Sequence, residues 1–195
     1  MKIIDDERVQ QRARLLAGLN EDPIVAEAIA GMEKALGRGN KVLVFGNGGS
    51  ATQSSHFAAE LVNKFYFRRR ALPALALSAD MANVTSIAND EAFAVVFSRQ
   101  VEAFAAKGDV ALGISTSGRS ANVLQALAVA RERGLLTIAL AGRQVEALRA
   151  IPTDIVIAVD ADDTPAIQEM HLFVLHVMAE MIEKKLCGGT HDHTV

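Results

Sequence analysis

The sequence has little cysteine and no long apolar segment. Cys187 is the single cysteine among 195 residues, which excludes an internal disulfide and is typical of a protein of a reducing compartment. No apolar run reaches the ~18 residues that a membrane-spanning helix needs. The first residues are charged throughout and lack the apolar core of a secretory signal. We therefore expect a cytoplasmic protein with no membrane partner.

The sequence also lacks a strong excess of charge of one sign. Lysine and arginine total 20, aspartate and glutamate total 23, and the formal net charge is −3. Nothing in this balance indicates a nucleic-acid partner, and the 50% hydrophobic content is that of a globular protein. A chain of 195 residues suits one domain. We expect N-terminal helices over 1–38, an α/β core over 39–187 and a flexible tail over 188–195.

Short apolar runs alternate with segments of helical periodicity along the chain. Helical spacing over 3–19 and 24–37 is interrupted at Asp22-Pro23, which fits an N-cap followed by a proline at the first helical position. The predicted strands are 41–45, 75–77, 110–114, 136–141 and 155–159. The helices predicted between and after them run from the first glycine loop to about residue 64, then over 90–104, 120–133 and 164–186. This order predicts an α/β three-layer sandwich with a five-stranded, mostly parallel sheet and helices on both faces.

The last predicted helix is apolar around much of its circumference. Such a helix buries more than one face. Packing on its own sheet and participation in a subunit interface both fit this pattern.

Two strand-to-helix turns are rich in glycine or hydroxyl side chains: Gly46-Asn47-Gly48-Gly49-Ser50 and Ser115-Thr116-Ser117-Gly118-Arg119-Ser120. A helix that begins at such a turn offers free N–H groups and the positive end of its dipole, which together bind phosphate. Each turn could instead be structural, with ordinary capping by Ser117 or Ser120. Ligands of open α/β sheets bind beyond the carboxyl ends of the strands, where both turns lie. Together they predict a phosphorylated metabolite, and the absence of a GxGxxG motif disfavours a dinucleotide.

Four polar residues on two predicted helices could carry acid–base chemistry. His56 and Glu60 are four residues apart and so share one helix face. Gln168 and His176 are eight residues apart, about 80° around the helix, so both can reach one cleft. A surface pair and a core histidine are the plain alternatives. Aldose–ketose isomerisation moves a proton between C1 and C2, and a positioned carboxylate with an imidazole suits that work.

Five motifs in order resemble those of the phosphoheptose isomerase family of SIS-domain proteins. They are Gly46-Asn47-Gly48-Gly49-Ser50, His56-Phe57-Ala58-Ala59-Glu60-Leu61, Ala88-Asn89-Asp90, Ser115-Thr116-Ser117-Gly118-Arg119-Ser120 and Thr164-Pro165-Ala166-Ile167-Gln168-Glu169-Met170-His171. The resemblance spans roughly residues 40–185. It implies an SIS-type sandwich and conversion of sedoheptulose 7-phosphate into D-glycero-D-manno-heptose 7-phosphate, a step toward activated heptose.

The resemblance also implies roles for individual residues. Glu60 matches the general base and His176 its acid–base partner. The implied ligands of one zinc ion are His56, Glu60, Gln168 and His176. The implied substrate contacts are Asn47, Gly48, Gly49, Ser50, His56, Glu60, Asn89, Asp90, Ser115, Thr116, Ser117, Ser120 and Gln168. The implied assembly is a homotetramer whose active sites are lined by more than one subunit.

The chain departs from the family pattern at two places. Lys64 stands where many members carry arginine, which keeps the charge but loses bidentate geometry. The connection Ala141-Gly142-Arg143-Gln144 is shorter than the usual glycine-rich one.

Other interpretations stay open at this point. A non-catalytic SIS protein, either a sugar-phosphate sensor or a relative of the replication-initiator-associating proteins, would keep the phosphate loops, but it has no chemical need for both Glu60 and His176. A hexose or pentose phosphate could replace the heptose.

Three polar features are left outside the predicted site. Arg68-Arg69-Arg70 is expected to form a solvated face after a helix. His171 is left unassigned, and the tail from Cys187 to His193 is expected to be structural or without a role.

Overall fold

The computed structural model describes residues 5–188 and has an α/β fold with one five-stranded sheet. The strands are β1 (Val42–Gly46), β2 (Ala74–Ala76), β3 (Val110–Ser115), β4 (Leu136–Ala141) and β5 (Ile155–Ala158). Their order is β2-β1-β3-β4-β5 and every pairing is parallel. The five predicted strands are confirmed, and the sheet is fully parallel over the described residues.

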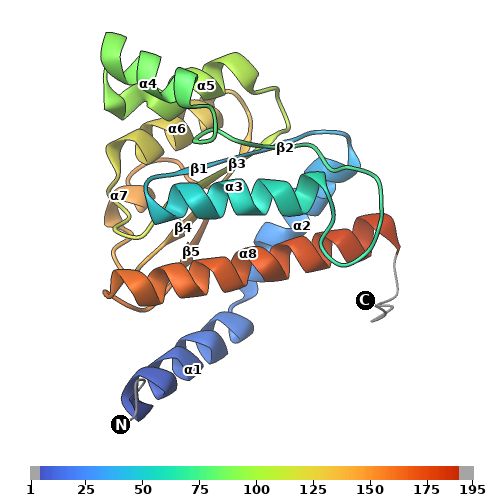
Figure 1. The fold of residues 1–195 in the computed structure, drawn as a ribbon, viewed down its shortest axis with the longest axis vertical. Helices are drawn as coiled ribbons and strands as arrows, with labels where there is room; N and C mark the ends of the chain where they lie inside the picture. The colour runs from blue at the N-terminus through green and yellow to red at the C-terminus, as the bar shows by residue number, and fades with distance from the viewer. Residues whose placement is uncertain (1–4, 189–195) are drawn as a thin grey trace.

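Helices cover both faces of the sheet, as predicted (Figure 1). On one face lie α2 (Pro23–Gly37), α3 (Gly49–Val62) and α8 (Thr164–Cys187). On the other lie α4 (Met81–Asp90), α5 (Val96–Phe104), α6 (Ala121–Glu132) and the short α7 (Glu146–Arg149). The N-terminal α1 (Asp6–Glu21) projects away from the sheet and contacts α8.

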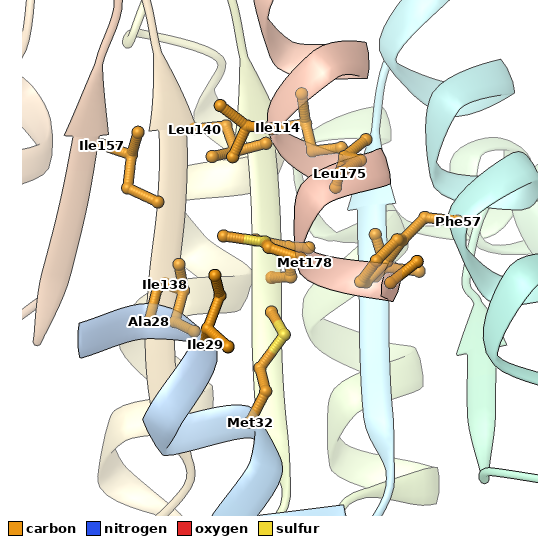
Figure 2. Close-up of a cluster of buried hydrophobic side chains, with 14 of the residues drawn as sticks. Ala28, Ile29, Met32, Phe57, Ile114, Ile138, Leu140, Ile157, Leu175 and Met178 are labelled. Atoms are coloured by element: carbon orange, nitrogen blue, oxygen red, sulfur yellow. The ribbon is translucent and has the colours of Figure 1, made fainter. Parts of the chain in front are cut away.

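Side chains of the buried strands alternate between two apolar cores. On β3, Leu112 and Ile114 belong to the core beneath α2, α3 and α8, whereas Ala111 belongs to the core beneath α5 and α6. Figure 2 shows the first core, where Met32 of α2 and Met178 of α8 meet the strand side chains. This two-sided burial is the reason that the strands read as continuous apolar runs.

Local sequence signals explain most helix starts. Asp22 accepts a hydrogen bond from the Ile24 N–H at 2.9 Å, and Pro23 occupies the first turn of α2. Asp163 accepts one from the Ala166 N–H at 3.2 Å at the start of α8. The predicted break at Asp22-Pro23 therefore divides two separate helices.

The prediction of one helix over 90–104 was wrong. The structure has α4 ending at Asp90, a 3₁₀ turn over Phe93–Val95, and α5 starting at Val96. Ala92 is fully extended, with φ −164° and ψ 151°, and this interrupts the helix. The helix α4 was not predicted, although Asp80 caps its start and Met81, Val84 and Ile87 recur at helical spacing.

The long helix α8 has apolar side chains on two sides. Its inner face packs on the sheet, while Phe173 and Met181 stay 43% and 37% exposed. These two side chains line an apolar cavity together with residues of α1 and α2. Within residues 5–188 no helix, α8 included, has the length and apolar character to cross a membrane. Apart from Gly188, the predicted flexible tail lies outside the described residues.

His171 lies in the core and binds the end of β4. Its imidazole is fully buried, its Nε2 lies 3.1 Å from the Ala141 carbonyl oxygen, and its Nδ1 has no partner among the described residues. Burial lowers the pKa of His171 from 6.5 to about 4, against the smaller opposing effect of the Ala141 carbonyl. The residue serves the fold.

This burial predicts that acid destabilises the protein between pH 6.5 and pH 4. Because the pKa is lower in the folded state, the unfolded chain binds the proton first, so stability falls as the pH falls through this window. The corresponding loss is roughly 3 kcal/mol in the free energy of unfolding. Urea unfolding of wild type and His171→Gln at pH 7.5 and pH 4 measures it. The variant should lose about 3 kcal/mol less than wild type on acidification; equal losses would contradict this account.

Candidate active site

The two predicted phosphate loops lie side by side at the carboxyl edge of the sheet. The first follows β1 and the second follows β3, and these strands pair directly, with Gly46 opposite Ile114. In the order β2-β1-β3-β4-β5, the connection after β1 leads to β2 on one side, and the connection after β3 leads to β4 on the other. The position between β1 and β3 is therefore the topological switch point, where ligands of such sheets bind.

A reciprocal amide pair joins the two loops. The Asn47 Nδ2 donates to the Asn122 Oδ1 at 2.9 Å, and the Asn122 Nδ2 donates to the Asn47 Oδ1 at the same distance. Asn122 lies in the first turn of α6 and is 3% exposed. The sequence reasoning missed Asn122, because only the pairing of β1 with β3 brings it to Asn47.

The helices that follow the two loops both begin without a side-chain cap. Neither Gly48 at the start of α3 nor Ser120 at the start of α6 caps its helix with a side chain. Instead, the Ser115 hydroxyl donates to the Ser120 Oγ at 3.0 Å, and Ser117 accepts from the Arg119 N–H at 3.3 Å. The Ser50, Ala51 and Val123 N–H groups already donate to the backbone carbonyls of Asn47, Gly48 and Ser120. Within residues 5–188 the Gly49, Ala121 and Asn122 N–H groups make no such bond, and these amides can meet a ligand at the loops.

The candidate acid–base residues meet between α3 and α8, which pack side by side (Figure 1). The Nε2 atoms of His56 and His176 are 2.8 Å apart, and a Glu60 carboxylate oxygen lies 3.5 Å from the His56 Nε2. At the histidine contact, one Nε2 donates and the other accepts. The side chains of His56 and Glu60 are 41% and 23% exposed, so a solute can reach them.

The surroundings of His176 favour its neutral form. Burial lowers the pKa of His176 most strongly; the neighbouring His56 lowers it further, and the Glu60 carboxylate acts in the opposite direction. The Phe65 ring packs against the imidazole, with 5.8 Å between ring centroids. A neutral imidazole can accept a proton at one nitrogen and donate at the other.

Gln168 lies at the first glycine loop. A Cβ at Gly49 would come within 2.5 Å of the Gln168 Nε2, so the glycine leaves room for this side chain. The Gln168 carbonyl oxygen accepts a hydrogen bond from the Gln53 Nε2 at 2.7 Å. Gln168 and His176 are about 12 Å apart along α8 by helical rise. Both side chains lie against α3, Gln168 at Gly49 and His176 at His56.

Asn89 and Asp90 lie at the end of α4, on the other face of the sheet. The Asn89 Nδ2 donates to the Asp90 Oδ1 at 2.7 Å, and Asp90 lines a groove between α4 and α5. Within residues 5–188, no hydrogen bond connects them to the phosphate loops. The hydrogen bonds within residues 5–188 join the two loops to each other and α3 to α8, and the substrate role of Asn89 and Asp90 stays a prediction.

The rim beside the second loop is held by charge. Arg143 donates to Asp160 and Asp162, each at 2.8 Å. It borders a cavity of about 200 Å³ that Thr116 and Ser117 also line. Lys64 is exposed just beyond the end of α3.

The prediction of a solvated face at Arg68-Arg69-Arg70 was wrong for the middle residue. The Arg69 side chain is 2% exposed and its Nε lies 3.0 Å from a Glu183 carboxylate oxygen, whereas Arg68 and Arg70 are exposed. A buried carboxylate on α8 pairs with this guanidinium, and no local pattern in the sequence reveals that contact.

The predicted metal ligands contain donors that suit zinc. Two imidazoles and a carboxylate with an open position form a common catalytic zinc set, and His56, His176 and Glu60 supply these groups. In the described part of the chain, however, no three histidine, cysteine, aspartate or glutamate side chains are already arranged to hold a metal ion. The histidines instead form a hydrogen-bonded pair.

Comparisons with known proteins identify the family of this chain. The model of the SIS domain family matches residues 9–142. The phosphoheptose isomerase of Pelobacter propionicus is 45% identical over 188 residues, which cover 94% of this chain and 99% of that protein. This chain belongs to the phosphoheptose isomerase family of SIS-domain proteins.

Two solved structures of family members have the same fold. The phosphoheptose isomerase of Neisseria gonorrhoeae has a TM-score of 0.84 and 37% identity, and the match covers 91% of this chain and 96% of that one. The phosphoheptose isomerase of Francisella tularensis has a TM-score of 0.86 and 33% identity, with 92% and 96% covered. The chain is thus an isomerase of this family, and the predicted SIS fold is confirmed.

The geometry of the second loop predicts that one added methyl group weakens sugar-phosphate binding. Gly118 has φ +64°, and a Cβ there would lie 2.0 Å from the Gln144 carbonyl oxygen. Gly118→Ala should therefore displace the loop and weaken sugar-phosphate binding by roughly tenfold to a hundredfold, the worth of one or two charge-assisted hydrogen bonds. Isothermal titration with sedoheptulose 7-phosphate measures the affinity.

The matched control for this variant is Gly39→Ala. Gly39 has φ +85° but nothing within 4 Å of the added Cβ, so it carries the backbone strain without the clash. Its affinity should remain that of wild type. Unchanged affinity in Gly118→Ala would show that the loop does not bind the phosphate.

Proposed function

We propose that this protein converts sedoheptulose 7-phosphate into D-glycero-D-manno-heptose 7-phosphate. The observation that carries the proposal is the grouping of Glu60 with His176 beside His56, where α3 packs against α8. Gly49 and His56 are about 10 Å apart along α3 by helical rise. This span suits a phosphorylated sugar, with its phosphate at one end and its reacting carbons at the other.

The loops would bind the phosphate group. Hydroxyl groups of Ser115, Thr116, Ser117 and Ser120 lie with the uncapped amides of α6, and the amide pair of Asn47 with Asn122 keeps the first loop beside them. Such a cradle binds a dianion through many oriented donors, without a fixed cation.

Glu60 and His176 would carry the proton transfer. The Glu60 carboxylate removes a proton from C1 of the ketose, and the electrons form the enediol double bond between C1 and C2. His176 moves a proton from O1 to O2 through its neutral imidazole, so that O1 becomes the aldehyde oxygen. Glu60 then returns its proton to C2, and the substrate's atoms are conserved. The lowered pKa of His176 keeps its imidazole in the form that this exchange needs.

A zinc ion would assist the reaction. The side chains proposed to hold it are His56, Glu60 and His176, with Gln168 as a fourth ligand after movement of its amide from Gly49. When bound, zinc supplies Lewis-acid polarisation of the sugar oxygens.

The enzyme would act in the cytoplasm, and its product would supply activated heptose for surface polysaccharide. We propose a homotetramer as the working assembly. The partly exposed Phe173 and Met181, next to the apolar cavity between α8 and the N-terminal helices, support association of subunits through this side of α8.

The role of Glu60 predicts the behaviour of Glu60→Gln. The amide keeps the shape of the side chain but cannot accept the C1 proton, so kcat should fall by at least about 10²-fold to 10⁴-fold while sugar-phosphate affinity stays within a few-fold of wild type. NMR detection of the aldose product gives kcat, and calorimetry gives the affinity. Glu132→Gln, on an exposed residue at the end of α6, is the matched control. Full activity in Glu60→Gln would remove Glu60 from the mechanism.

The metal proposal is tested by removal and return of zinc. Dialysis against a chelator should abolish turnover, and one equivalent of zinc should restore it. Calorimetry of the metal-free protein should give one zinc site per subunit. His56→Ala should lower the zinc affinity by roughly tenfold or more, because one direct ligand of the metal is lost. Undiminished turnover after verified metal removal would exclude a catalytic zinc ion.

A further inference from the structure

A buried ion pair joins the segment that connects α3 to β2 with the helix α8. Arg69 and Glu183 have side chains that are only 2% and 1% exposed, and the Arg69 Nε donates to the Glu183 Oε1 at 3.0 Å. Arg68 and Arg70, on either side of Arg69, are exposed. Burial of both charges costs solvation energy, and apolar residues of similar size are often at least as stabilising. Stability alone therefore gives no reason for this pair.

Glu183 ties the connecting segment to α8. Its two carboxylate oxygens accept the backbone N–H groups of Phe65 and Tyr66 at 2.8 and 2.7 Å, in addition to the Arg69 guanidinium. Glu183 follows His176 by seven residues, about two helical turns, so the two side chains leave α8 on nearly the same side. The bound segment places the Phe65 ring against the His176 imidazole.

Arg69 ties the same segment to α3. Its Nη2 donates to the carbonyl oxygen of Glu60 at 2.7 Å, and its Nη1 donates to that of Leu61 at 2.7 Å. Carbonyl groups in the last turn of a helix lack partners within the helix, and here the guanidinium supplies them. One guanidinium thus contacts the backbone of Glu60 and the carboxylate on the helix that carries His176.

We propose that Arg69 and Glu183 are positioning residues, which hold the Glu60 and His176 side chains at the separation needed for proton transfer. This inference rests on the proposed isomerase function. The planar guanidinium suits the task, because its N–H groups leave in fixed directions toward α3 and α8 at once, which a lysine ammonium cannot reproduce.

The first test compares Arg69→Met and Glu183→Gln with the control Arg70→Met. Both buried variants should lower kcat by about tenfold to a hundredfold, because displacement of a reacting group by about 1 Å has effects of this size. Their KM should stay within a few-fold of wild type, since the first phosphate loop lies at the N-terminal end of α3 and Arg69 contacts the C-terminal end. Arg70→Met should keep wild-type kcat. A wild-type kcat in folded Arg69→Met would overturn the proposal.

The double variant Arg69→Met/Glu183→Gln separates positioning from stability. It leaves no unpaired buried charge, so its urea midpoint should recover toward wild type relative to the single variants. Its kcat should remain low, because the contact with the Glu60 carbonyl is still missing. Recovery of kcat together with the midpoint would reduce the pair to a structural role.

Arg69→Lys gives an independent comparison if Arg69→Met does not fold. It keeps the buried charge for Glu183 but not the fork toward α3, so it should fold and still show the reduced kcat. Wild-type kcat in Arg69→Lys would show that charge alone suffices and would contradict the positioning role.

Two structural readouts do not depend on isomerisation. In wild type, NMR should show contacts between the ring protons of Phe65 and His176 and slow hydrogen exchange at the Phe65 and Tyr66 amides. Arg69→Met should lose the ring contacts and exchange these amides faster. If wild type does not isomerise the sugar but these changes occur, the proposed function fails while the coupling stands. Unchanged ring contacts in the variant would overturn the coupling itself.

Discussion

The direct parallel pairing of β1 with β3 at the centre of the sheet brings the two loops of the site together and sets where α3 and α6 begin. It sets Gly46 opposite Ile114, so two loops that are about seventy residues apart in the chain end at the same edge. From these loops α3 and α6 depart to opposite faces. The amide pair of Asn47 with Asn122 is a consequence of this register, and a shift of one residue would remove it.

The acid–base half of the site depends on a different contact, the packing of α3 against α8. The sheet sets the distance of both helices from its surface, since Phe57 of α3 and Leu175 of α8 pack in the same apolar core. The polar side chains on the adjoining faces then meet as the pair of His56 with His176. Apolar packing brings the two helices together. Hydrogen bonds of Arg69 and Glu183, near the C-terminal ends of the helices, further restrict the separation of α3 from α8.

Much of the fold follows from local sequence, and the failures have physical causes. Strands buried on both faces give strong apolar runs, and Asp22-Pro23 gives a clear helix boundary, so these features are predictable. The helix α4 was missed although it has local signals, the Asp80 cap and the apolar spacing of Met81, Val84 and Ile87. Within the site, the turns and the i, i+4 pair of His56 with Glu60 are local patterns. Asn122 and Arg69 depend on partners 75 and 114 residues away, and no local signal distinguishes them from surface residues.

The most direct measurement follows purified wild-type protein with sedoheptulose 7-phosphate by NMR. The account predicts that the ketose signals decay while the anomeric signals of an aldose 7-phosphate appear, at a rate proportional to enzyme concentration. Unchanged ketose signals with a zinc-loaded, folded protein that still binds the sugar phosphate would contradict it. In that case the protein would bind the sugar phosphate without the chemistry assigned to Glu60 and His176.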